Sequence, residues 1–261
     1  MSRLAQVTRT GTLITLLVCA SNSVAQQVPQ RTSRADPSRS PQAKAAGPRY
    51  LKAFVINDRL SALRRGPSIQ SEVIRRLRLA HPVYIVSISK AKPGQPRFCR
   101  VAVTRRTRGW IHASALAVQS RAGEDQRIMT LIEETSDGVD KITLCRIIIE
   151  RFARSRLVPR ALLLLGEEGE RAATTLSQRT RRRLAEVPAT DASLRDYYLS
   201  DAGLDRYSRL GIVFDFNEST GEFVYDGKAY REIVRRFPGG EEARRARQRL
   251  ELAIRKTAQQ R

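Results

Sequence analysis

The pattern of apolar and polar positions changes along the chain, and the change marks two regions of different secondary structure. Residues 50–118 contain short apolar or alternating runs separated by turn residues, whereas residues 122–258 place apolar side chains three and four positions apart. Short alternating runs are typical of β-strands, and the three-and-four spacing is typical of amphipathic helices. The sequence therefore predicts an all-β domain at 50–118 and an all-α domain at 122–258.

In the first region, β-branched and aromatic runs mark the expected strands. They lie at 53–56, 81–88, 98–103 and 110–112, and the segment 91–96 between two of them is a loop by its Pro and Gly content. Four or five short strands in about 70 residues are typical of a small all-β barrel or sandwich.

In the second region, the spacing of apolar residues predicts a series of helices with identifiable ends. Asp137-Gly138 breaks the first two, Pro159 suits the first turn of the third, and Pro238-Gly239-Gly240 separates the last two. A reverse turn is expected between 212–214 and 222–225. The helices are expected at 128–136, 139–152, 160–184, 194–210, 228–236 and 241–255.

The N-terminal segment has the order of features that defines a secretory signal peptide. Arg3 and Arg9 precede the apolar run 13–20, and the small-residue site Ser23-Val24-Ala25 follows. We therefore expect a signal peptide at 1–25 and export to the periplasm or cell envelope, with no transmembrane segment left after cleavage. Residues 26–48 are rich in Pro, Ser, Gln and Ala, which predicts a disordered linker.

Composition adds a strong positive charge with two competing interpretations. The formal net charge is +22, and 41 of the 48 basic residues are arginine. A surface that binds anions would explain this charge, and so would a genome that encodes arginine at solvated positions. The arginines are spread over the whole chain, which favours the compositional interpretation. Export and the absence of basic motifs interleaved with aromatic residues argue against a specific nucleic-acid partner.

Motifs for catalysis, metal binding or cofactor binding are not found in the sequence. No nucleophile elbow, phosphate-binding loop, dinucleotide fingerprint or zinc-ligand spacing occurs, and the two histidines are His81 and His112. We therefore expect no catalytic residues, no metal and no cofactor. The mature chain keeps Cys99 and Cys145, for which both a disulfide and two buried thiols remain open.

Several segments of the first region resemble the bacterial Src-homology-3-like domain. The resemblance rests on the turn Arg64-Arg65-Gly66-Pro67-Ser68, the apolar positions Val73, Ile74, Leu77, Val83 and Ile85, and the closing run Gly109-Trp110-Ile111-His112-Ala113-Ser114-Ala115-Leu116. It implies a small barrel over 50–118. Two positions depart from that family: Ala80 stands where a turn glycine is usual, and Cys99 stands where a second aromatic residue is common.

The second region contains a faint internal repeat. Glu150-Arg151-Phe152 with Ala161 and Leu165 has the same offsets as Arg235-Arg236-Phe237 with Ala246 and Leu250. Both copies resemble the junctions of tetratricopeptide-like helical hairpins, in which a small residue lets the next helix pack closely. The resemblance implies an all-α tetratricopeptide-like domain over 122–258, although an ordinary helical domain with two similar hairpins remains an alternative.

Together these resemblances imply an exported, non-enzymatic binding or scaffold protein of the bacterial cell envelope. The barrel would bind peptidoglycan or a peptide, and the helical domain would bind a protein partner. By the same resemblance the ligand surface would use Tyr84, Phe98, Trp110 and His112, with Arg64 available for a carboxylate. Two other functions stay open: an accessory or degenerate cell-wall hydrolase, and an electrostatic binder of anionic envelope polymers.

Overall fold

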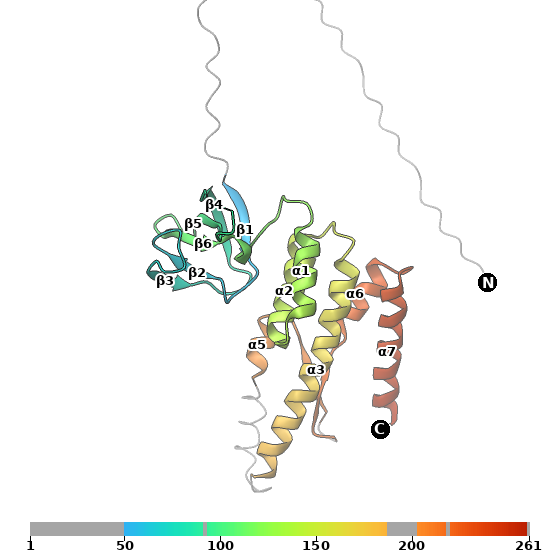
Figure 1. Ribbon diagram of the computed structural model, residues 1–261. Helices are drawn as coiled ribbons and strands as arrows, with labels where there is room; N and C mark the ends of the chain where they lie inside the picture. The colour runs from blue at the N-terminus through green and yellow to red at the C-terminus, as the bar shows by residue number, and fades with distance from the viewer. Residues whose placement is uncertain (1–49, 91–92, 187–202, 218–219, 260–261) are drawn as a thin grey trace, which may run out of the picture. The chain divides into compact units, whose positions relative to one another are not determined.

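The computed structural model describes residues 50–90, 93–186, 203–217 and 220–259 (Figure 1). The expected signal peptide at 1–25, the expected linker at 26–48 and most of the helix expected at 194–210 lie outside these residues. Within the part that is described, no helix is both long enough and apolar enough to cross a membrane.

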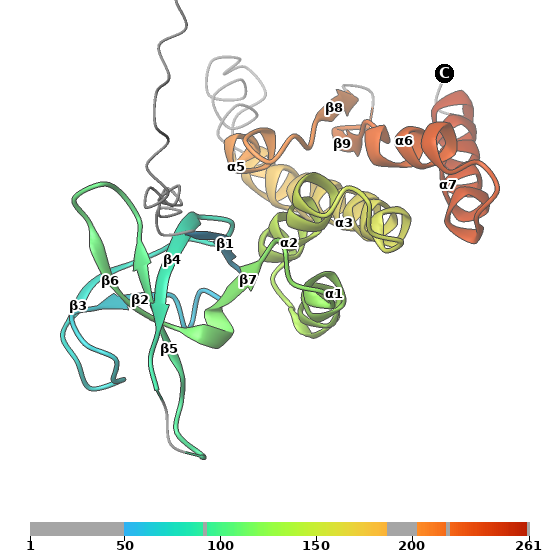
Figure 2. The same cartoon turned by 90° about the horizontal axis from the view of Figure 1, so that it is seen from above.

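Residues 51–118 form one antiparallel sheet with seven strands (Figure 2). The strands lie in the order β3-β2-β6-β5-β4-β1-β7, so that β3 and β7 are the outermost strands and each pairs with one neighbour. A short 3-10 turn at Ala113–Ala115 connects β6 to β7. The strands are β1 (Leu51–Val55), β2 (Ala62–Arg64), β3 (Val73–Arg76), β4 (Pro82–Ile88), β5 (Phe98–Ala102), β6 (Arg108–His112) and β7 (Leu116–Val118).

Alternation along the strands gives the sheet a buried face and an exposed face. In β5 and β6, Cys99, Val101 and Ile111 are buried in one apolar cluster, whereas Arg100 between them is exposed. The cluster also contains residues of β1, β2, β4 and β7. Gly109 lets β2 approach β6, because a Cβ atom there would lie 2.8 Å from the main-chain oxygen of Arg64.

The rest of the described chain forms helices and one β-hairpin. Asp137 caps the N-terminus of α2 by accepting hydrogen bonds from the main-chain nitrogens of Val139 and Asp140, at 2.9 and 3.0 Å. In Figure 2, α3 lies between α2 and the α6–α7 pair, and it contacts these helices and strand β9. The elements are α1 (Glu124–Glu134), α2 (Gly138–Arg151), α3 (Val158–Ala185), α5 (Leu204–Ser208), β8 (Phe214–Asn217), β9 (Glu222–Tyr225), α6 (Lys228–Arg236) and α7 (Glu241–Gln259).

The end of the sheet and the start of the helices are joined by buried contacts. Ile56 and Ala117, from the sheet region, are buried in the same apolar cluster as α1, α2 and α3. Arg127 of α1 donates hydrogen bonds to the main-chain oxygens of Leu116 and Ser114 and to the carboxylate of Glu124. Because Glu124 is only 3% exposed, this ion pair orders the first turn of α1 against β7.

The predicted all-β barrel is wrong, because the first region is a seven-stranded antiparallel sheet in which β3 and β7 do not pair with each other. The sequence pattern missed three strands for a physical reason. β2, β3 and β7 have only three or four residues each, which is too short for an apolar alternation to stand out.

The predicted all-α domain is also wrong, because the second region contains the β8–β9 hairpin. The main-chain nitrogen of Phe223 in β9 donates to the buried hydroxyl of Ser177 in α3, at 2.8 Å. The hairpin thus covers a face of α3 that a neighbouring helix would cover in a helical repeat. Moreover, α3 has 28 residues, whereas a tetratricopeptide repeat fits two helices and their turns into about 34.

Candidate functional site

The exposed face of the sheet carries basic and aromatic side chains from five strands. We call this surface the outer face and define it by Lys52 of β1, Arg64 of β2, Tyr84 of β4, Arg100 of β5, and Arg108 and Trp110 of β6. Residues directly opposite each other on paired strands point to the same side of the sheet. Each of the six lies opposite another of the six or opposite Ala102, which itself pairs with both Tyr84 and Arg108. The sheet itself therefore brings them together.

Two cross-strand rows run over the outer face. In the first row, Trp110 lies opposite Arg64 on one neighbouring strand and opposite Arg100 on the other. The second row runs from Arg108 through Ala102 and Tyr84 to Lys52. Side chains directly opposite each other on antiparallel strands have Cβ atoms about 4.5–5.5 Å apart. Each row therefore places cations within reach of an aromatic ring.

The cations of the outer face have no carboxylate partner in the described part of the chain. Arg64 donates one hydrogen bond to the main-chain oxygen of Ser71 at 2.7 Å, and Lys52 lies 5.6 Å from the ring centroid of Phe54. Arg100 and Arg108 are exposed, and no described acidic side chain lies within ion-pair distance of either. These guanidinium groups therefore remain available to an anionic ligand.

The five residues singled out from the sequence fall into two groups. Tyr84, Trp110 and Arg64 belong to the outer face, where Tyr84 is 46% exposed. Phe98 is 2% exposed and pairs with His112 across β5 and β6, with the two rings 5.5 Å apart and edge to face. The Nδ1 atom of His112 accepts a hydrogen bond from the main-chain nitrogen of Ser114, which ties this ring to the turn that follows β6.

Charge is distributed very unevenly between the sheet and the helices. Residues 50–118 contain fourteen lysine and arginine residues but only two acidic residues, Asp58 and Glu72. Residues 119–261 contain 27 basic and 23 acidic residues and are close to balanced. Glu72 also forms an ion pair with Arg65 at 2.7 Å, which leaves the sheet region with a large excess of unpaired positive charge.

Sequence reasoning missed Lys52, Arg100 and Arg108 as members of the site. Two features of the sequence nevertheless point to these residues. Arg100 interrupts the apolar run of β5 at an alternate position, which predicts a side chain on the face opposite Cys99 and Val101. The scarcity of acidic residues over 50–118 is also readable from the sequence, but the distribution of the arginines alone does not show it.

The described residues contain no exposed thiol. Cys99 and Cys145 are both free and buried, in different apolar clusters, and burial raises the pKa of each thiol, for Cys145 to about 12. The structure therefore answers the open question of a bridge between them: the two thiols are unpaired. No group of three or more His, Cys, Asp or Glu side chains in the described ranges is arranged to hold a metal ion.

Comparison of the chain with family models, curated proteins and solved structures finds no match. The resemblances found in the sequence therefore gain no support from related proteins.

Proposed function

We propose that this protein is a non-enzymatic binding protein of the bacterial cell envelope, and that the outer face of its sheet binds an anionic polymer. The observation that carries the proposal is the sheet region's fourteen basic residues against two acidic ones, together with the row Arg64–Trp110–Arg100. Of the functions left open by the sequence, electrostatic binding of an anionic envelope polymer is the one that this geometry supports best.

The arrangement suits a polymer more than a small anion. The two rows extend over five of the seven strands, so charges repeated along a chain can be met by several cations at once. The exposed ring of Tyr84 and the half-buried ring of Trp110 offer flat apolar surfaces on which sugar rings can stack between the charged groups. An anionic glycan or phosphate-bearing polymer combines both features.

Binding of the full mature chain, residues 26–261, to long-chain polyphosphate and to purified peptidoglycan tests the proposal. Affinity should fall steeply between low and high salt, because each neutralised charge on the polymer releases a counterion. For the four cations of the outer face, the slope of log affinity against log salt should be about −3, at about −0.7 to −0.9 per charge. Dextran, a neutral polymer, should not bind.

A matched pair of variants locates the binding surface. Arg100→Glu with Arg108→Glu reverses two charges on the outer face, and Arg179→Glu with Arg182→Glu reverses two exposed charges on α3. The first pair should weaken binding roughly thirtyfold, because each basic residue near an anionic surface contributes about 1 kcal/mol to binding. The second pair should have little effect. Equal losses in both would show that net charge acts without a site, and salt-insensitive binding to peptidoglycan would refute the electrostatic mechanism.

A further inference from the structure

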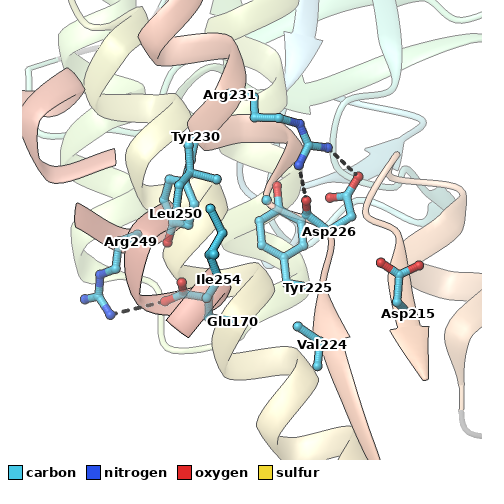
Figure 3. Close-up of a pocket in the computed structure, with 12 residues that line it drawn as sticks. Glu170, Asp215, Val224, Tyr225, Asp226, Tyr230, Arg231, Arg249, Leu250 and Ile254 are labelled. Carbon is cyan, nitrogen blue, oxygen red and sulfur yellow. Dashed lines mark hydrogen bonds and ion pairs between the residues drawn. The ribbon is translucent and has the colours of Figure 1, made fainter. Parts of the chain in front are cut away.

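A pocket of about 710 Å³ lies in the helical region, among α3, the β8–β9 hairpin, α6 and α7 (Figure 3). Its volume falls within the range of about 300–1,000 Å³ that is usual for small-molecule sites. The apolar part of the wall comes from three different elements. It is formed by Val224, Tyr225, Tyr230, Leu250, Ala253 and Ile254.

Charged side chains stand around this apolar wall, and most of them are already paired. Arg249 forms an ion pair with Glu170 at 3.2 Å, and Arg231 forms one with Asp226 at 3.4 Å (Figure 3). Asp215 lines the pocket as well, so the lining holds three carboxylates and two guanidinium groups. An anionic ligand would meet net negative charge here, whereas a neutral ligand would leave the existing ion pairs intact.

The polar group that distinguishes the pocket is the hydroxyl of Tyr230. Tyr230 is 1% exposed, and its hydroxyl has no hydrogen-bond partner among the described residues. The neighbouring hydroxyl of Tyr225 is already engaged, because it accepts a hydrogen bond from the main-chain nitrogen of Ala229 at 2.9 Å. A buried hydroxyl without a partner is rare in native proteins and is relieved when an acceptor reaches it.

Tyr230 is held firmly in the pocket wall. Its ring packs against the main chain of α3 at Gly166, and it meets the ring of Tyr225 edge to face with the centroids 6.1 Å apart. Burial raises the pKa of both phenols, so each stays protonated and Tyr230 acts as a hydrogen-bond donor. Because the oxygen itself is buried, a ligand that accepts its hydrogen bond has to displace the side chains that cover it.

We propose that this pocket binds a neutral amphiphile with an apolar acyl chain and one hydrogen-bond acceptor, such as an ester carbonyl, that takes the hydrogen bond of Tyr230. The acyl chain would cover the aliphatic side chains of the wall, of which Ile254 is 69% exposed and Val224 is 39% exposed. This site is separate from the outer face and does not depend on it.

The test is calorimetric titration of the mature chain with 1-decanoylglycerol below its micellar concentration, at high salt to suppress binding to the basic sheet. Decanoate serves as the anionic counterpart with the same chain length. We expect micromolar binding of the neutral ester and at least tenfold weaker binding of the anion. Equal or tighter binding of decanoate would overturn the proposal, because it would show that charge and not the apolar wall selects the ligand.

Three variants separate the parts of the argument. Ala253→Trp fills the pocket from α7 and should abolish binding. Tyr230→Phe removes the donor but keeps the ring, and it should weaken binding of the ester about fivefold to tenfold while the protein stays folded. Tyr50→Phe, a matched change at an exposed tyrosine that belongs to neither site, should leave binding unchanged.

Two outcomes would refute the proposal. If Tyr230→Phe bound the ester as tightly as the unmodified chain, the role of the hydroxyl would be wrong. If sedimentation showed a dimer that Ala253→Trp dissociates, the pocket would be covered by a second copy of the chain and not by an amphiphile.

Discussion

Replacing Gly166 by alanine tests how tightly α3 and α6 are packed behind the pocket. A Cβ atom at Gly166 would lie 2.4 Å from Cε1 and 2.7 Å from Cζ of Tyr230. Withdrawal of the ring from α3 would disturb its packing, since Tyr230 is 1% exposed and stands edge to face against Tyr225. The added methyl group therefore forces a displacement of about 1 Å in a close-packed interior.

Two opposing contributions set the expected change in the free energy of unfolding. Alanine is favoured over glycine within a helix by about 1 kcal/mol. Overpacking a core typically costs about 1–3 kcal/mol, and the displacement of a whole aromatic ring belongs near the upper end of that range. Gly166→Ala should therefore destabilise the protein by about 1–2 kcal/mol.

Gly169, three residues further along the same helix, provides the matched control. A Cβ atom there would meet Cδ2 of Tyr225 at 3.0 Å and Cγ at 3.1 Å, so the ring has to yield by only a few tenths of an ångström. The gain in helix propensity is the same at both positions. Gly169→Ala should thus be close to neutral or slightly stabilising, and the difference between the two variants isolates the steric effect.

Urea unfolding followed by far-ultraviolet circular dichroism measures both variants against the unmodified chain. The urea midpoint for Gly166→Ala should lie clearly below that for Gly169→Ala, and its melting temperature should be lower by about 2–8 °C, because 1 kcal/mol shifts the melting temperature of a domain of this size by about 2–4 °C. If the two variants differed by less than about 0.5 kcal/mol, or if Gly166→Ala were the more stable one, the packing argument for the α3–α6 contact would be refuted.

Two further predictions concern the turn before β4. Ala80 has a φ of 62°, a backbone conformation that is unfavourable for any residue with a Cβ atom. Ala80→Gly should therefore raise the free energy of unfolding, measured in thermal melts, by up to about 1 kcal/mol. Ala102→Gly, the control within β5, should lower it. Burial, and to a smaller extent the charge of Arg75, lower the pKa of His81, so the unfolded chain takes up this proton at a higher pH than the folded chain. The free energy of unfolding should therefore fall as the pH drops below about 6.5. Urea midpoints measured at pH 7.5 and 5.5 should show this loss in the unmodified chain and not in His81→Gln.

Much of the secondary structure could be predicted because its signals are local. The alternation of apolar and polar residues marked β4, β5 and β6, and the proline residues at 159 and 238 marked the start of α3 and the break between α6 and α7. The β8–β9 hairpin was also visible as a reverse turn. These features depend on neighbouring residues along the chain, so the sequence pattern is sufficient to find them.

The architecture could not be predicted because it depends on contacts between distant segments. Strands of three residues, such as β2 and β7, gain their stability from the strands beside them, and their own sequence carries little β signal. The hairpin's place on α3 depends on the Ser177–Phe223 hydrogen bond, which links residues 46 positions apart. Ala80 illustrates the same limit: the missing turn glycine was noticed, but only the structure shows that this alanine keeps a positive φ.

The charge distribution supports the proposed role of the basic outer face over the alternative that its charge is a by-product of arginine-rich composition. In the helical region, exposed arginines pair with carboxylates one turn away, as in Arg236–Glu232 and Arg245–Glu241, so an arginine-rich composition is compensated there. A genome-wide bias toward arginine would act on the sheet region in the same way and would not remove its acidic residues. What requires an explanation is therefore the scarcity of carboxylates over residues 50–118. Binding of an anionic polymer, as proposed, provides one, because each carboxylate added near the outer face would repel such a polymer.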